Sequence, residues 1–149
     1  MVYEGTHIYA SVDPNNENLL NWLETFLERQ PGFVVNLARL LRRHRPVRCS
    51  ACGAENEACP ECGEPFAMST SKGLTTQMVV DLMALHTNNA CDVPIVVSSD
   101  TELMPVIQYL TSNGVKVIHA GWREAGLDLA RQAWASIELD HLIPELIRS

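Results

Sequence analysis

The chain has 149 residues, of which 46% are hydrophobic, and this fits one globular domain with a sizeable core. Its 18 acidic residues outnumber its 11 Lys and Arg, and the net charge of −7 argues against a protein that coats nucleic acid generally. No window approaches the roughly 18 apolar residues of a membrane span, and the N-terminus lacks the basic patch and apolar run of a signal peptide. We therefore expect a cytoplasmic protein with no membrane contact.

The first part of the chain predicts a strand, a helix and a second strand. Residues 7–12 alternate between apolar and polar positions as a strand does, and the turn residues 13–16 follow. Asn16 can cap a helix that runs to about Gln30, where Pro31-Gly32 ends it. Residues 33–40 are strand-like by β-branching and alternation. The apolar helix positions are Leu19, Leu20, Trp22, Leu23, Phe26 and Leu27.

The second part predicts alternating helices and strands. Helices are expected at 74–89, 101–112 and 125–135, followed by a short C-terminal helix. The continuous apolar run 93–98 predicts a buried parallel strand, and 115–119 predicts the next strand. A strand, a helix and a strand in immediate succession are typical of a βαβ unit. The sequence therefore predicts an α/β domain with a mainly parallel sheet.

Positive charge concentrates in residues 39–48, a run without any acidic residue. Such a run is typical of a solvated strand edge or loop. The alternative is an edge that contacts phosphates, because the planar forks of Arg match phosphate oxygens. In that case Arg42, Arg43 and Arg45 are the candidate contacts.

Four cysteines form two copies of one motif, Cys49-x-x-Cys52-Gly and Cys59-x-x-Cys62-Gly. Two cysteines separated by two residues can both reach one metal ion, and the following glycine permits the tight turn. Four thiolates make a closed tetrahedral site, which predicts structural zinc; iron in the same cage or a redox disulfide are the alternatives. The hairpin either closes a long insertion or also presents the adjacent arginines to a nucleic acid. Cys91 has no neighbouring cysteine and is expected to be a small core residue.

Three acids are candidates for a second metal site. Asp81 interrupts an apolar helical stretch, so it either lies on a solvent stripe or lines a polar cleft. Asp100 and Glu102 follow the apolar strand, where ligands bind in parallel α/β sheets, although Asp100 could simply cap the next helix. Carboxylates that converge without His ligands suit Mg²⁺ or Mn²⁺.

Two stretches together resemble the NYN domain of the PIN-like nucleases, LabA-like members in particular. Residues 72–85 hold a Lys-Gly and a Val-Asp-Leu, and residues 91–106 hold Ser-Ser-Asp-Thr-Glu where the family has a Ser-Gly-Asp-Ser-Asp-like segment. Residues 114–122 fit the same pattern, and the likeness covers about residues 6–140. It implies a PIN-like α/β/α sandwich over 1–149 as a single domain, with an inserted zinc-ribbon hairpin at 47–66.

The resemblance also implies a function, namely Mg²⁺- or Mn²⁺-dependent cleavage of RNA by a cluster of acids. Asp81 matches the helix acid, Asp100 matches the first acid of the strand-end segment, and Glu102 takes the place of the second. Lys72, in the Lys-Gly pair, is then a further candidate contact to RNA.

The chain departs from the family pattern at three points. Thr75 replaces an acid that usually follows Lys-Gly, Ser99 replaces a glycine, and the chain starts after the usual first strand and its Asp. We therefore expect an N-terminally short domain with an open sheet edge, which a second copy or a partner chain completes. The resulting hypothesis is an endoribonuclease-like hydrolase, truncated or weakened by the absent acid. The alternative is a non-catalytic RNA-binding or protein-interaction module stabilised by zinc.

Overall fold

The computed structural model describes residues 3–70 and 72–143, which fold as two compact units, Met1–Leu74 and Thr75–Ser149. Each unit mixes helices with strands, and each contains a parallel strand pair, so the predicted α/β class with parallel pairing is confirmed. The first unit contains β1 (Thr6–Val12), α1 (Glu17–Asn21), η1 (Trp22–Leu27), β2 (Phe33–Arg39), β3 (Leu41–His44), β4 (Val47–Arg48), β5 (Glu55–Asn56) and β6 (Ala67–Thr70). The second contains α2 (Leu74–Thr87), β7 (Ile95–Val97), η2 (Thr101–Leu103), α3 (Met104–Ser112), β8 (Ile118–Gly121), α4 (Leu127–Gln132), β9 (Ala135–Glu138) and η3 (Leu139–His141).

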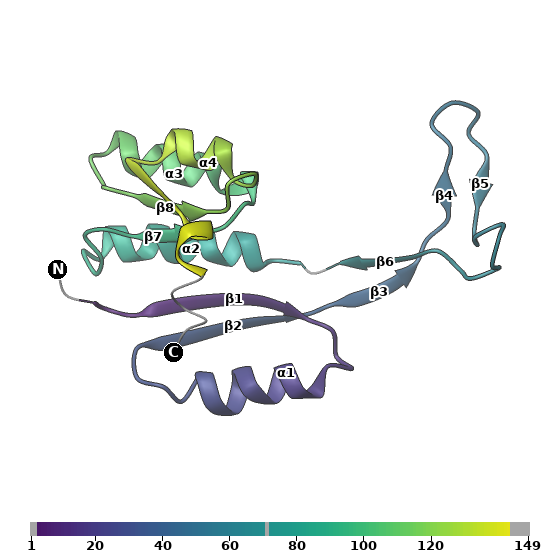
Figure 1. The fold of residues 1–149 in the computed structure, drawn as a ribbon, viewed down its shortest axis with the longest axis horizontal. Helices are drawn as coiled ribbons and strands as arrows, with labels where there is room; N and C mark the ends of the chain where they lie inside the picture. Colours follow the sequence, from purple (N-terminus) through teal and green to yellow (C-terminus); the bar gives the residue numbers. More distant parts are fainter. Residues whose placement is uncertain (1–2, 71, 144–149) are drawn as a thin grey trace. The chain divides into compact units, whose positions relative to one another are not determined.

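In the first unit, β1 and β2 run parallel and are joined through the helix α1–η1 (Figure 1). The register pairs Thr6 with Phe33 and Val12 with Arg39. Alternation along the strands turns one face toward the helix, where Leu23 and Leu27 pack against Val12. These contacts form the small core of this unit, with the half-buried Ile8, Ala10, Leu20, Phe33, Val35 and Leu37 around it.

The helix differs from the predicted one in length and in the face that it buries. It ends at Leu27 rather than near Gln30, and η1 is a π-helical turn in which the backbone N–H of Glu28 reaches the carbonyl of Leu23. Only part of the apolar set faces the strands. Trp22 and Phe26 are exposed, with ring centroids 6.2 Å apart. The apolar stripe of this helix is wider than the surface that the two strands cover, so the apolar side chains at its edge stay exposed.

The same unit continues into an antiparallel arm. β3 pairs with β6, from Leu41 opposite Thr70 to His44 opposite Ala67, and the shorter pair β4–β5 lies beyond them (Figure 1). The basic run 39–48 lies mostly on β3 and β4, and its residues from 41 onward are exposed.

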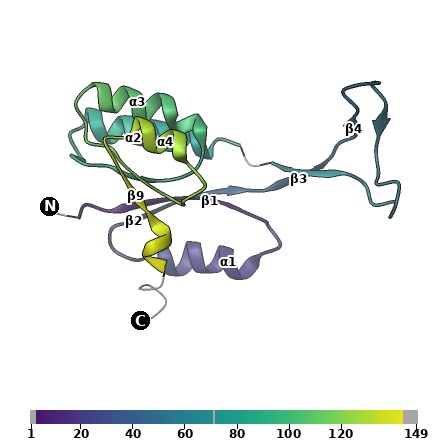
Figure 2. The same cartoon turned by 45° about the horizontal axis from the view of Figure 1, so that its top comes forward.

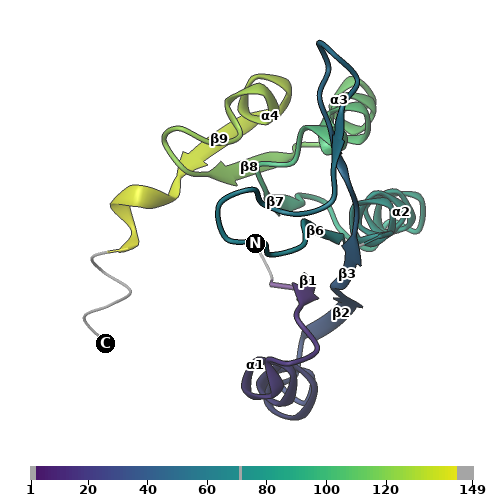
Figure 3. The same cartoon turned by 90° about the vertical axis from the view of Figure 1, so that its right-hand side faces the viewer.

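In the second unit, β7, β8 and β9 form a parallel sheet in that order. Ile95 pairs with Ile118, and Ile118 pairs with Ala135. Helices α3 and α4 contact each other and lie on the same side of this sheet, as Figures 2 and 3 show. The βαβ unit that the sequence predicts, from β7 through α3 to β8, is therefore present.

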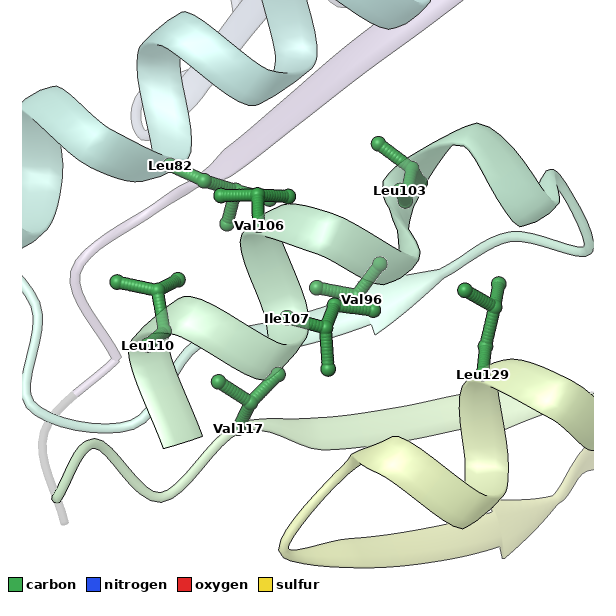
Figure 4. Close-up of a cluster of buried hydrophobic side chains, with 8 residues drawn as sticks. All are labelled: Leu82, Val96, Leu103, Val106, Ile107, Leu110, Val117 and Leu129. Carbon is green, nitrogen blue, oxygen red and sulfur yellow. The ribbon is translucent and has the colours of Figure 1, made fainter. Parts of the chain in front are cut away.

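The core of this unit lies between the sheet and its helices (Figure 4). Val96, in the middle of β7, is 1% exposed. Its neighbours on the strand, Ile95 and Val97, point to the opposite face. The other buried side chains of this cluster come from α2, η2, α3 and α4 and from the residue before β8: Leu82, Leu103, Val106, Ile107, Leu110, Val117 and Leu129.

Three features of this unit differ from prediction. Ile95 and Val97 are 55% and 60% exposed, so β7 is covered on one face only and is not buried on both. β8 begins at Ile118 rather than at Val115, because Val115 and Val117 lead into the strand from the end of α3. β9 was not predicted, since Ala-Ser-Ile-Glu is only four residues long and has a single large apolar residue.

Near the C-terminus, the predicted short helix corresponds in part to the single turn η3, and residues 144–149 lie outside the described range. Among the described helices, none combines the length and the apolar character needed to cross a membrane.

Candidate functional site

The turn that follows β7 holds Asp100 in a defined position. Its backbone is extended (φ −77°, ψ 110°), and its Oδ1 accepts a hydrogen bond from the backbone N–H of Glu102 at 3.0 Å. The backbone N–H of Asp100 donates in turn to the hydroxyl oxygen of Ser98 at 3.1 Å. Asp100 therefore caps η2, which is the structural role that the sequence offered for it.

The second oxygen of Asp100 is held by a residue from a different element. The hydroxyl of Thr75 donates to Oδ2 at 2.8 Å, and both side chains are half-buried. Thr75 lies in the first turn of α2, where the helix dipole favours negative charge. Each carboxylate oxygen has one hydrogen bond and retains a lone pair for a further ligand. The carboxylate is thus oriented before any ligand arrives.

Asp81 and Glu102 have different surroundings. Asp81 is half-buried on α2, where Gln77 Nε2 donates to its Oδ1 at 2.8 Å. It stands about 9 Å beyond Thr75 along the helix axis, at 1.5 Å per residue. The side chain of Glu102 is exposed on η2. Within the described residues, no three His, Cys, Asp or Glu side chains are grouped closely enough to hold a metal ion.

The structure thus brings Asp100 together with Thr75, the residue that stands where the family usually has an acid. It does not gather the three predicted acids into one cluster. His119 was not among the predicted site residues; it is 2% exposed, and its Nε2 lies 2.8 Å from the carbonyl oxygen of Ser98. A histidine inside an otherwise apolar strand, followed by Ala-Gly, was the available signal.

The two cysteine motifs adopt the same local geometry. The N–H of Cys49 bonds to the carbonyl of Ala54, and the N–H of Gly53 bonds back to Cys49. Residues 59–64 repeat both bonds, with lengths of 2.8 to 2.9 Å in each motif. Gly53 and Gly63 have φ of 74° and 72°, a left-handed conformation that favours glycine. Each motif is therefore a turn that brings two thiols to the same side.

Backbone amides point at the first thiol of each motif. The N–H of Cys52, followed by that of Ala51, lowers the pKa of Cys49, and the N–H of Cys62 is the largest cause of the lowered pKa of Cys59. The second thiol of each pair lowers the pKa of the first further. Amides that stabilise a thiolate are what a metal-bound cysteine requires, so the donor set fits zinc chemically. The two pairs do not meet as one four-sulfur cage among the described residues. Cys91 is half-buried rather than fully buried.

The basic arm contains one well-paired arginine and several exposed ones. Arg42 forms an ion pair with Asp13 at 2.9 Å. The pKa of Asp13 is lowered, first by the backbone N–H of Asn15 and then by Arg42. Arg43, like Lys72, is exposed to solvent.

At the base of the hairpin lies a groove of about 410 Å³ that combines positive charge with apolar surface. It is lined by Arg45, Pro46, Val47, Arg48, Phe66, Ala67 and Met68. The lining contains no acidic residue, although Arg48 has Glu55 at 3.9 Å. Such a surface suits a phosphate chain whose bases contact apolar side chains.

Comparison with known families gives one match. The family model described as the NYN domain matches residues 6–140, which include the acids at the end of β7, the helix α2 and the cysteine hairpin. Neither the curated proteins nor the solved structures that were compared give a match. Since the match spans nearly the whole chain, and the strands pair in parallel as this fold requires, the chain belongs to the NYN domain family of the PIN-like nuclease superfamily.

Proposed function

We propose that this chain is a Mg²⁺- or Mn²⁺-dependent endoribonuclease whose central acid is Asp100. The observation that supports this most strongly is the position of the carboxylate. It lies at the carboxyl end of a parallel strand, with its two oxygens held by the Thr75 hydroxyl and the Glu102 N–H. Ligands of parallel α/β folds bind at that end of the sheet.

Asp81, Asp100 and Glu102 are the residues proposed to hold the ion, since carboxylate oxygens are the ligands that Mg²⁺ and Mn²⁺ prefer. A bound ion would supply charge stabilisation at the phosphate and an activated water. The three acids are not gathered among the described residues. A complete site therefore needs Asp81 or Glu102 to move toward Asp100, or an acid from another chain.

The test is an RNA cleavage assay on chelator-washed protein, with and without Mn²⁺, that compares the parent with Asp100→Asn. Asparagine preserves the cap to Glu102 and removes the charge, so the fold should persist while cleavage falls at least 100-fold. Asp92→Asn is the matched control, because Asp92 is exposed and precedes the N-terminal end of the same strand. Equal Mn²⁺-dependent cutting by Asp100→Asn and the parent would refute the proposed site.

We propose that RNA contacts the basic arm through Arg42, Arg43 and Arg45, with Lys72 as an additional contact. Of these, Arg43 and Arg45 have no acidic partner among the ion pairs of the described residues, whereas Arg42 is paired with Asp13. Arg43→Ala with Arg45→Ala should weaken RNA binding and reduce its dependence on salt, because fewer counterions are released. Arg29→Ala, an exposed arginine outside the arm, is the control. Unchanged affinity and salt slope in the double variant would exclude this surface.

We propose that zinc joins the two cysteine motifs of residues 47–66 through Cys49, Cys52, Cys59 and Cys62. The matched turns and the amides directed at Cys49 and Cys59 support this assignment. Metal analysis should find one zinc per chain, lost in Cys49→Ser and retained in Cys91→Ser. If the metal found is iron, the site is an iron site instead. If the cysteines form disulfides without metal, the motifs are a redox pair instead.

A non-catalytic RNA-binding protein is the second candidate function. The absence of a three-acid cluster from the described residues favours it, as does the basic, partly apolar groove beside Phe66. The two functions separate in the same assay. RNA binding without cleavage in Mn²⁺, by folded protein that contains zinc, would select the binding function.

A further inference from the structure

Among the described side chains, His119 is the only polar one that is buried. It pairs with Val96 across the parallel β7–β8 ladder, so both side chains point to the same face of the sheet, on which Val96 joins the core cluster with residues of α3 and α4. Its partner is the carbonyl oxygen of Ser98, 2.8 Å from Nε2. Because a carbonyl only accepts, Nε2 carries the hydrogen in this bond. A buried imidazole is costly unless it is hydrogen-bonded, so this contact has a structural consequence.

Two glycines leave the room that the imidazole ring occupies. A Cβ on Gly121 would lie 2.5 Å from Cε1 of His119, and a Cβ on Gly126 would lie 3.0 Å from the ring and 3.1 Å from the Ser98 carbonyl oxygen. Any larger residue at either position would push the ring away from Ser98. The ring therefore occupies space that a side chain at either position would fill, and its Nε2 faces the carbonyl of Ser98.

That atom belongs to the turn that carries Asp100. His119 holds the carbonyl of Ser98, and the hydroxyl oxygen of Ser98 accepts the N–H of Asp100 at 3.1 Å. The carboxylate of Asp100 is then aimed at the N–H of Glu102 and the hydroxyl of Thr75. The chain of contacts runs from β8, in the interior of the sheet, to the carboxylate beyond the end of β7.

We propose that His119 is a positioning residue, which fixes the 98–100 turn and thereby aims the Asp100 carboxylate. This inference rests on the proposed function for its effect on cleavage, while its effect on the turn holds independently. His119 does not touch the substrate in this role. It acts through Ser98, and a side chain that donates a hydrogen bond from the same distance should replace it in part.

The test compares His119→Gln with His119→Met. The two side chains have nearly the same length and both lack the ring, but only Gln donates from a position close to Nε2. Amide hydrogen exchange reports the turn directly. The N–H of Glu102, bonded to Asp100, should exchange at least tenfold faster in His119→Met than in His119→Gln, while the amide of the core residue Leu110 exchanges equally in both. In Mn²⁺, kcat should fall about tenfold further in His119→Met, with KM for RNA unchanged between the two variants.

Equal exchange of the Glu102 amide in the two variants would overturn the positioning role. Loss of cleavage in Asp100→Asn but not in His119→Met would overturn it as well, and would leave the nuclease proposal standing. Full cleavage by Asp100→Asn would instead remove the nuclease proposal, and the exchange data would still decide the role of His119. If neither variant folds, the parent protein supplies the answer through the nitrogen resonances of its imidazole. Nε2 should carry the hydrogen, and a ring protonated on Nδ1 alone would contradict the proposed bond.

Discussion

Thr75→Asp places a carboxylate where the NYN pattern usually has one, and its effect can be estimated from one measured contact. Thr75 Oγ1 lies 2.8 Å from Asp100 Oδ2, so an aspartate at position 75 sets two negative oxygens within about 4 Å of each other. The variant loses the hydroxyl hydrogen bond and gains a like-charge pair. We therefore expect it to be less stable than the parent without metal and to gain more from Mn²⁺.

The size of the repulsion follows from Coulomb's law. Two unit charges 4 Å apart interact with about 1 kcal/mol in water and about 4 kcal/mol at an effective dielectric constant of about 20. Both side chains are half-buried, so the repulsion should lie between these limits. Loss of a hydrogen bond to a charged group adds about 1.5–3 kcal/mol. Thr75→Val shows the second cost alone, and the difference between the two variants isolates the repulsion.

Thermal and urea unfolding, each with and without Mn²⁺, measure both effects. Thr75→Asp should bind Mn²⁺ at least tenfold more tightly than the parent, since a cation between two carboxylates removes their repulsion. Thr76→Asp is the control, because it adds the same charge to the same helix turn at an exposed position. A Mn²⁺ stabilisation of Thr75→Asp no larger than that of Thr76→Asp would refute the view that Thr75 faces a metal site.

Three further predictions concern the core and the charged groups. Ile107→Ala, at a fully buried position of α3, should lower the free energy of unfolding by about 2–5 kcal/mol, measured in urea. The lowered pKa values of Cys49 and Cys59 stabilise their thiolates above the unfolded pKa, and this contribution is lost as the pH falls through the folded values. Zinc should therefore be released progressively on acidification, as a zinc indicator dye would show. Arg42→Ala should raise the pKa of Asp13 only part of the way toward 3.8, as measured by carboxyl NMR, because the backbone N–H of Asn15, the largest single cause, remains; full return to 3.8 would contradict this.

Much of the fold could be predicted because its signals are local. The apolar run at 93–98 and the Asn113-Gly114 stop give β7 and α3 to within a few residues. What failed depended on neighbours. Whether Ile95 is covered depends on what lies against its face of the sheet, and β9 forms because β8 offers it a parallel edge. Neither condition can be predicted from the sequence of the segment alone.

The site residues also could be predicted only where the signal is local. The sequence places Asp100 at a strand end and even offers its capping role, and the structure has both. The contact between Thr75 and Asp100 joins residues 25 positions apart, and spacing alone does not predict it. His119 was missed because a lone histidine in an apolar strand carries no periodicity. Its importance comes from two glycines and a carbonyl that meet it only after folding.

The cap and the metal ligand are not competing explanations of Asp100. Capping η2 occupies one lone pair of Oδ1 and requires an acceptor, not a charge, so asparagine satisfies it equally well. Holding a divalent ion requires the charge, and the bond from Thr75 keeps that charge aimed in one direction without neutralising it. The bond from His119 to the carbonyl of Ser98 supports the turn in either role. The proposed metal role therefore depends on the charge of Asp100, and the comparison of aspartate with asparagine separates the two roles because it leaves the cap in place.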